Sequence, residues 1–142
     1  MFEDKVFHVI RVILQEHTAR WSSLMPELTK PQYAVLEALD QEHELDQLSL
    51  GQASATKRGT LTEMLARMEK KGLIERRAGE KDARQKKVVM TKKGKQVLDE
   101  AKLVADRVTD SFLETLSPEE LTNFQKTLHK MLTEARKPKS IA

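Results

Sequence analysis

SATKRGTLTEMLARMEKKGLIERRAGEKDARQKKVVMT, residues 54–91, is the stretch that decides the fold of this chain. Within it, Leu61, Leu65 and Met68 recur at spacings of four and three residues. That spacing places apolar side chains on one face of a helix, so the pattern predicts a helix over residues 56–71 with one buried side.

The same stretch predicts how this helix ends and which elements come after it. Ser54 or Thr56 is expected to cap the first turn, because a hydroxyl oxygen can accept a free backbone N–H there. Gly72 supplies the left-handed residue that commonly ends a helix. Residues 73–77 and 87–91 then read as two short strands joined by a charged turn.

Positive charge is concentrated in this part of the chain. Residues 57–95 hold 14 Lys/Arg and 5 Asp/Glu, whereas the rest of the chain holds 11 and 17. Such segregation favours a surface that meets a polyanion. The alternative is a solvated, lysine-rich surface, which is what most charge runs are. We favour nucleic acid, because the charges flank a helix start and a hairpin tip, two protrusions that fit DNA grooves.

Length and composition exclude several classes of protein. A chain of 142 residues is one domain, or one domain with helical extensions. The absence of cysteine excludes disulfides, thiolate zinc sites and thiol redox switches. No apolar run approaches the ~18–20 residues that span a bilayer, so we expect a cytoplasmic protein with no membrane partner. His8 and His17 point to opposite sides of one helix, and no catalytic motif is present, so we expect no metal, no cofactor and no enzyme activity.

A helix-turn-helix precedes the hairpin. Thr29 is a good N-cap and Pro31 suits a first helical position, which predicts a helix over residues 32–41. The acidic stretch 40–46 reads as a turn that can include a short strand at its end. A short third helix over residues 48–53, followed by a tight turn and the basic helix, completes the pattern.

Long amphipathic helices are expected on both sides of this region, over residues 2–22, residues 92–116 and onward from Pro118. Ser117 and Glu120 form a capping box at the start of the last one. These helices are long for a monomer of this size, so we expect two copies to pair across a two-fold axis. The alternative is that they pack only within one chain. A dimer would hold two recognition helices one DNA turn, ~34 Å, apart.

The arrangement resembles the MarR family of bacterial winged helix-turn-helix regulators over nearly the whole chain. The motifs that carry the resemblance are LTKPQ at residues 28–32, RMEKKGLI at 67–74, DAR at 82–84 and MTKKG at 90–94. Each is weak alone, but their order and spacing together are specific. Gly51 is a departure, because family members often have alanine there.

The resemblance implies a fold that is mainly α with a small β-hairpin wing. It implies a winged helix-turn-helix DNA-binding region over residues 30–94 and a helical dimerisation region over residues 1–29 and 95–142. A homodimer would bind pseudo-palindromic operators in double-stranded DNA, as a repressor released by a small, often aromatic and anionic, ligand. The alternatives are a non-specific architectural DNA- or RNA-binding protein and a ligand-independent activator.

The resemblance also implies which residues contact DNA. The start of the recognition helix should reach the major groove through Ser54, Thr56, Lys57, Arg58, Gly59, Thr60 and Thr62. Arg84 should enter the minor groove from the wing tip, with Asp82 orienting it. Phosphate contacts are expected from Arg76, Arg77, Lys86 and Lys87.

An effector site is implied between the first, second and fifth helices. His17 and Trp21 share one helix face, and Tyr33 opens the next helix. Arg11 and Arg20 are candidates to hold an anionic effector. The plainer interpretation places Trp21 and Tyr33 in the core, His17 at its edge and both arginines on the surface, and it is the one we favour.

Overall fold

The computed structural model describes residues 2–79 and 86–138, with side chains from residue 5 onward. Asp82 and Arg84, the residues expected at the wing tip, lie outside the described residues. The chain divides into two compact units, Met1–Asp106 and Arg107–Ala142.

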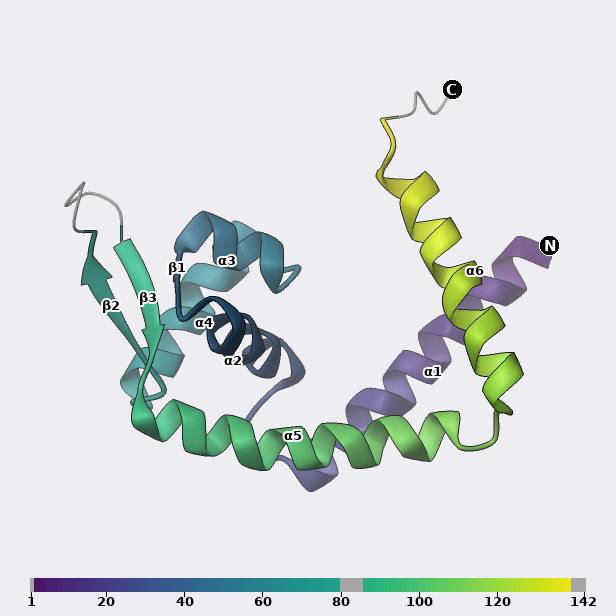
Figure 1. Ribbon diagram of the computed structural model, residues 1–142, viewed down its shortest axis with the longest axis horizontal. Helices are drawn as coiled ribbons and strands as arrows, with labels where there is room; N and C mark the ends of the chain where they lie inside the picture. The colour runs from purple at the N-terminus through teal and green to yellow at the C-terminus, as the bar shows by residue number, and fades with distance from the viewer. Residues whose placement is uncertain (1, 80–85, 139–142) are drawn as a thin grey trace. The chain divides into compact units, whose positions relative to one another are not determined.

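The chain is mainly helical with one small sheet, which confirms the predicted fold class (Figure 1). Its elements in order are α1 (Phe2–Leu24), α2 (Lys30–Glu42), β1 (Glu44–Asp46), α3 (Gln47–Ala53), α4 (Arg58–Lys70), β2 (Ile74–Ala78), β3 (Lys86–Met90), α5 (Lys92–Leu113) and α6 (Pro118–Arg136). Among the described residues, no helix is long and apolar enough to cross a membrane.

The three strands form an antiparallel sheet in the order β1-β3-β2. In the predicted hairpin, Ile74 lies opposite Met90 and Ala78 opposite Lys86, so both strands sit one residue away from their expected bounds. The short strand foreseen after α2 pairs with β3, with Leu45 opposite Val88. The helix-turn-helix is therefore tied to the hairpin through a third strand.

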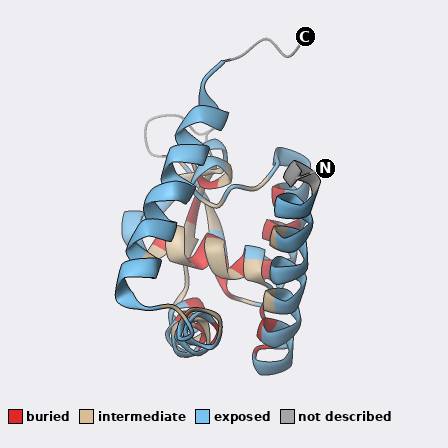
Figure 2. Ribbon diagram, turned by 90° about the vertical axis from the view of Figure 1, so that its right-hand side faces the viewer, coloured by how far each residue is buried: buried red, intermediate tan, exposed pale blue. Residues whose placement is uncertain are grey.

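Buried residues gather around this sheet (Figure 2). Leu61, Leu65 and Met68 of α4 are all buried, which confirms the predicted stripe. The other fully buried large side chains in this unit are Leu28, Val35, Leu36, Leu39, Leu50, Ile74, Val88 and Leu98. In α5, Leu98, Ala101 and Val108 are fully buried, whereas Val97 is half-buried.

Two of the predicted helix caps are confirmed. Thr29 accepts the Gln32 N–H at 3.2 Å while Gln32 accepts the Thr29 N–H at 3.1 Å. Ser117 and Glu120 exchange the same two bonds at the start of α6, at 3.1 and 3.0 Å. Both helix starts are reciprocally capped, so each leaves fewer backbone donors unpaired.

The predicted cap of α4 is wrong. Lys57 occupies the N-cap position and makes no side-chain cap bond. The Ser54 hydroxyl instead donates to the Leu50 carbonyl at 2.7 Å, and the Thr56 hydroxyl donates to the Ser54 carbonyl at 3.2 Å. The turn is tight, with Ala55 at φ 55°, and the helix begins only at Arg58, so both hydroxyls stabilise the turn rather than the helix.

A compact junction joins the end of α4 to the start of α5. Gly72 is left-handed at φ 79° and ends α4, as predicted. The Thr91 N–H donates to the Leu73 carbonyl at 3.1 Å, and the Thr91 hydroxyl donates to the Gly72 carbonyl. The Gly94 N–H then donates to the Thr91 hydroxyl at 3.0 Å. A Cβ on Gly94 would lie 2.1 Å from the Leu73 carbonyl oxygen, so only glycine fits.

An ion-pair cluster links α2 to α5. The two carboxylate oxygens of Asp40 accept hydrogen bonds from Lys95 and Lys102, each at 2.9 Å. Lys95 also contacts Asp99 at 3.2 Å. The hydrogen bonds from the two ammonium groups hold the pKa of Asp40 below its usual range.

Apolar side chains remain exposed on α1 and on α6. In α1, Val6, Val9, Ile13 and Leu14 are 37–55% exposed, and in α6, Phe124, Leu128, Met131 and Leu132 are 41–46% exposed. None of the described α6 residues is buried. Contiguous apolar faces of this kind mark surfaces that another molecule covers.

Replacing Gly94 by alanine should destabilise the protein by about 3 kcal/mol, because the new methyl group meets a backbone carbonyl that cannot move without breaking the junction. Urea unfolding followed by circular dichroism, at one fixed protein concentration, measures the loss. Gly59→Ala is the matched control. Its new Cβ meets no atom within 4 Å, so it should stabilise α4 by about 0.5–1 kcal/mol. Equal effects of the two substitutions would contradict the close approach at Gly94.

Asp40→Asn should cost about 1 kcal/mol or less at neutral pH, because the ion pairs are partly exposed. The pKa of Asp40 is lowered in the folded state, so its contribution is fully present above the unfolded pKa of ~3.9 and disappears as pH falls through the folded value. The stability gap between wild type and variant should therefore be constant from pH 7 to about 5 and close below about pH 4. Urea midpoints measured across this range test it, and a gap independent of pH would contradict it.

Candidate nucleic-acid interface

The turn between α3 and α4 sets the position of the recognition helix. Asp46 caps α3 by accepting the Ser49 N–H at 2.8 Å. A Cβ on Gly51 would lie 3.2 Å from the Thr56 carbonyl oxygen and 3.3 Å from a Leu61 methyl carbon. The departure at Gly51 therefore allows a close approach of α3 to the chain entering α4.

The residues expected in the major groove divide into two groups. Lys57, Arg58, Gly59 and Thr60 are exposed, and space beyond Gly59 is open for 4 Å. Ser54 and Thr56 are half-buried, and their hydroxyls are engaged within the turn. The structure thus presents the first group to solvent and uses the second to hold the turn.

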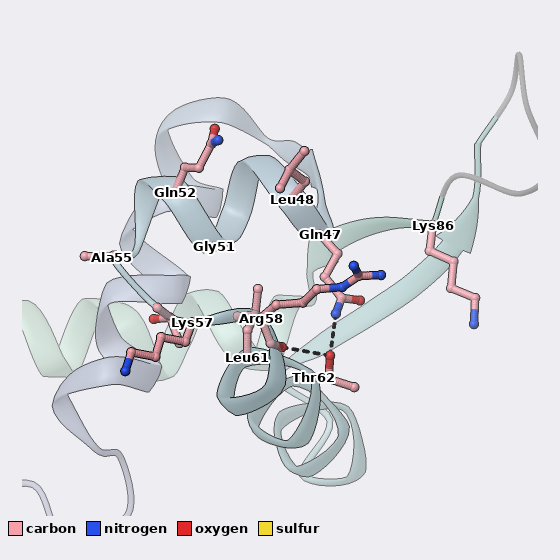
Figure 3. Close-up of a pocket in the computed structure, with 11 residues that line it drawn as sticks. Gln47, Leu48, Gly51, Gln52, Ala55, Lys57, Arg58, Leu61, Thr62 and Lys86 are labelled. Carbon is pink, nitrogen blue, oxygen red and sulfur yellow. Dashed lines mark hydrogen bonds between the residues drawn. The ribbon is translucent and has the colours of Figure 1, made fainter. Parts of the chain in front are cut away.

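Thr62 is exposed, but its hydroxyl is engaged. It donates to the Arg58 carbonyl at 3.0 Å and accepts from the Gln47 side-chain amide at 2.7 Å (Figure 3). Because its one hydrogen is used, Thr62 has none to donate to a base edge in this conformation. We had expected Thr62 to reach the groove, and Gln47 was not among our candidates.

A hollow of about 720 Å³ lies between α3, the start of α4 and the beginning of β3 (Figure 3). Five of the predicted DNA-binding residues line it: Thr56, Lys57, Arg58, Thr62 and Lys86. The remaining lining residues are Gln47, Leu48, Gly51, Gln52, Ala55 and Leu61. The structure therefore brings the recognition helix and the base of the wing together around one concave, cationic surface.

The four cations expected to contact phosphates differ in their partners. Arg76 is half-buried and pairs with Glu69 at 3.0 Å, and that hydrogen bond lowers the pKa of Glu69. Arg77 pairs with Glu75 at 3.0 Å on the same strand. Lys86 is exposed and lines the hollow, whereas Lys87 is half-buried. Of the four, Lys86 is the one that lines the hollow at the start of the recognition helix.

The expected effector residues Trp21 and Tyr33 lie in contact. Trp21 is 2% exposed, and its ring nitrogen donates to the Leu28 carbonyl at 2.7 Å. The two ring centroids are 5.0 Å apart and tilted by 49°. Burial and the neighbouring Glu37 raise the pKa of Tyr33. The Trp21 indole is thus core with a satisfied N–H, as the plainer interpretation expected.

A cation that we did not foresee contacts His17, which precedes Trp21 by four residues on α1. The Lys30 ammonium and the His17 Nδ1 are 3.1 Å apart. Burial, and secondarily the charge of Lys30, lowers the pKa of His17, and burial lowers the pKa of Lys30. Lys30 lies in the LTKPQ motif, but its sequence position gave no sign that it would face His17.

The two arginines are exposed on α1. Arg11 is 3.3 Å from the His8 ring and borders a hollow of about 540 Å³ that α1 alone lines. Arg20 is likewise exposed. In the part of the chain that the structure describes, no group of three or more His, Cys, Asp or Glu side chains is arranged to hold a metal ion.

Comparison with known proteins agrees with this geometry. The model of the MarR family matches residues 28–86. The transcriptional regulator HosA of Escherichia coli O127:H6 is 42% identical over 129 residues, which are 91% of this chain and 96% of HosA. HosA is a transcriptional regulator, which is the class of protein that we expected from the sequence.

Two solved structures share both the fold and part of the sequence. BpsR of Bordetella bronchiseptica, whose DNA binding is regulated by 6-hydroxynicotinic acid, has a TM-score of 0.85 at 26% identity and covers 92% of this chain and 95% of its own. PcaV of Streptomyces coelicolor, in complex with its natural ligand, has a TM-score of 0.84 at 29% identity and covers 91% of this chain and 92% of its own.

Proposed function

Because this chain belongs to the MarR family of DNA-binding transcriptional regulators, we propose that it binds a pseudo-palindromic operator as a homodimer and represses transcription until a small ligand releases it. The observation that best supports DNA binding is the hollow that Lys57, Arg58 and Lys86 all line. None of the three holds an ion pair with another described residue, so their charge is available to a polyanion.

In this proposal residues 30–94 form the DNA-binding region. Lys57 and Arg58 donate to guanine O6 and N7 in the major groove, and Lys86 contacts a phosphate. Arg84 enters the minor groove with Asp82 beside it, on the strength of the family resemblance. Arg76 and Arg77 must exchange a carboxylate for a phosphate, so we rank their contribution below that of Lys86.

The exposed apolar faces support the homodimer. Those of α1 and α6 belong to residues 1–29 and 95–142, the proposed dimerisation region. A surface that pairs with its own copy across a two-fold axis gives two recognition helices related by the same axis. The operator then has matching half-sites, which is the physical reason for a pseudo-palindrome.

The position of Lys30, next to His17, supports the proposal of an anionic effector. Lys30 can pair with a carboxylate, and the half-buried ring of Tyr33 can contact an aromatic molecule, with Trp21 packed behind it. BpsR responds to 6-hydroxynicotinic acid, an aromatic acid, and PcaV has a natural ligand of its own. We therefore propose an aromatic anion as the effector, with His17 beside its carboxylate and Arg11 and Arg20 as outlying cations.

Lys86→Ala should weaken binding to the operator and reduce the slope of log affinity against log salt by about two, because the dimer loses one phosphate contact in each half-site. Fluorescence anisotropy with labelled DNA flanking the protein's own gene, between about 50 and 200 mM salt, measures both quantities. Lys126→Ala removes an exposed lysine of α6 and should leave the slope unchanged.

The same titration distinguishes the alternatives. Binding that does not depend on salt would overturn the phosphate contacts. Equal affinity for the flanking DNA and for random duplex of the same length would favour a non-specific architectural protein. Transcription in vitro from the flanking promoter should fall as the protein is added, whereas a rise would identify an activator.

The single tryptophan reports on the effector region. Adding 6-hydroxynicotinic acid or substituted benzoates should change Trp21 fluorescence over the same concentration range that releases the operator. Lys30→Gln should raise the required concentration about tenfold or more, because a charged hydrogen bond is lost, while free protein still binds DNA. Lys5→Gln, an exposed lysine on α1, serves as control. A fluorescence change without DNA release would mean that the acid binds but does not regulate.

A further inference from the structure

Leu48 is an apolar side chain in an unexpected place. At 73% exposure it is the most exposed of the large apolar side chains in residues 5–79 and 86–138. It lies on the rim of the hollow that Lys57, Arg58 and Lys86 also line. Single exposed leucines are common on protein surfaces, but this one lies on the hollow where DNA is proposed to bind, so its side chain is placed to make an apolar contact with a base.

Gln47, the neighbouring residue on α3, is held by the recognition helix. Its amide nitrogen donates to the Thr62 hydroxyl at 2.7 Å, and Thr62 donates to the Arg58 carbonyl at 3.0 Å (Figure 3). This chain of bonds fixes the amide relative to α4. Among the described residues the amide makes no other hydrogen bond, which leaves one N–H and the carbonyl oxygen available.

These two side chains together match one kind of base pair. An amide with a free donor and a free acceptor is complementary to adenine, which offers N7 as acceptor and N6–H as donor in the major groove. The thymine 5-methyl group is the apolar group that a base pair displays there. A guanine–cytosine pair has no such methyl group, so an amide and a leucine side by side favour A·T.

We propose that Gln47 and Leu48 on α3 read an A·T base pair in each operator half-site, with the amide on the adenine and the leucine on the 5-methyl group of the thymine. Specificity then comes from α3 as well as α4. Thr62 acts as a positioning residue that holds Gln47 rather than as a base reader. The proposal rests on the proposed operator binding and adds which side chains and which bases are involved.

Selection of binding sequences from a random duplex library, with the full-length protein, tests operator recognition separately from the base readout by α3. An enriched two-fold motif supports operator recognition and supplies the DNA for the next step. Failure to enrich any motif overturns the proposed operator recognition itself, and this inference with it.

Uracil substitution then tests Leu48. Each thymine of the selected motif is replaced in turn by uracil, which lacks only the 5-methyl group. At one position per half-site the wild-type affinity should fall about fourfold, the effect of one buried methyl group. Leu48→Ala should be insensitive to uracil at that position, and Leu48→Met, which keeps an apolar contact, should retain the sensitivity. If every uracil substitution weakens wild type and Leu48→Ala equally, the leucine contact is wrong.

Gln47→Ala tests the amide. It should reduce the preference for A·T at the same position about tenfold or more, while affinity for random duplex stays within twofold. Gln41→Ala removes an exposed amide of α2 that does not line the hollow, and should leave the preference unchanged. A uniform loss of affinity for all sequences in Gln47→Ala would mean a phosphate contact and would overturn the proposed readout.

Discussion

The close approach of α5 to the chain leaving α4 is the constraint on which the arrangement of the first unit depends. Gly94 sits against the Leu73 carbonyl, and Thr91 bonds to both Gly72 and Leu73. Within a few residues these contacts fix the end of the recognition helix, the start of β2, the end of β3 and the first turn of α5. The direction of α4 relative to α5 is thus set mostly by backbone groups, which have little freedom to adjust.

The charged residues at the two ends of α4 differ in their ion-pair partners. Its buried stripe, Leu61 to Met68, faces the core, and its other side is free for solvent or DNA. Near the end of the helix, Glu69 pairs with Arg76 and offsets the positive charge there. At the start, Lys57 and Arg58 keep theirs, because no carboxylate of the described residues lies within ion-pair distance. The charges of Lys57 and Arg58 therefore contribute to the field at the hollow, where a polyanion can meet them, and Arg67 and Lys70 add positive charge at the other end of the helix.

Features that depend on neighbours in the sequence could be predicted, and those that depend on contacts across the fold could not. The capping boxes at Thr29 and Ser117 are local patterns, and both formed. The cap of α4 was wrong because Ser54 and Thr56 have competing carbonyls within a turn that the sequence does not reveal. In the candidate site, the basic residues were visible as charge. Gln47 was not predicted, because the sequence does not show that its side chain contacts Thr62, which lies 15 residues further along the chain.

In the proposed mechanism α2 connects the effector region to the DNA-binding region. Its first residue, Lys30, contacts His17 on α1, and near its other end Asp40 holds two lysines of α5. A helix of 13 residues is about 20 Å long and behaves as a rigid rod. A ligand that displaces Lys30 from His17 and tilts α2 would also move Asp40 relative to α5, and would move β1, which comes directly after α2 and is paired to the strand that carries Lys86. In this proposal α2 itself couples the effector region to the DNA-binding region, because its first residue contacts α1 and the strand that follows it pairs with β3.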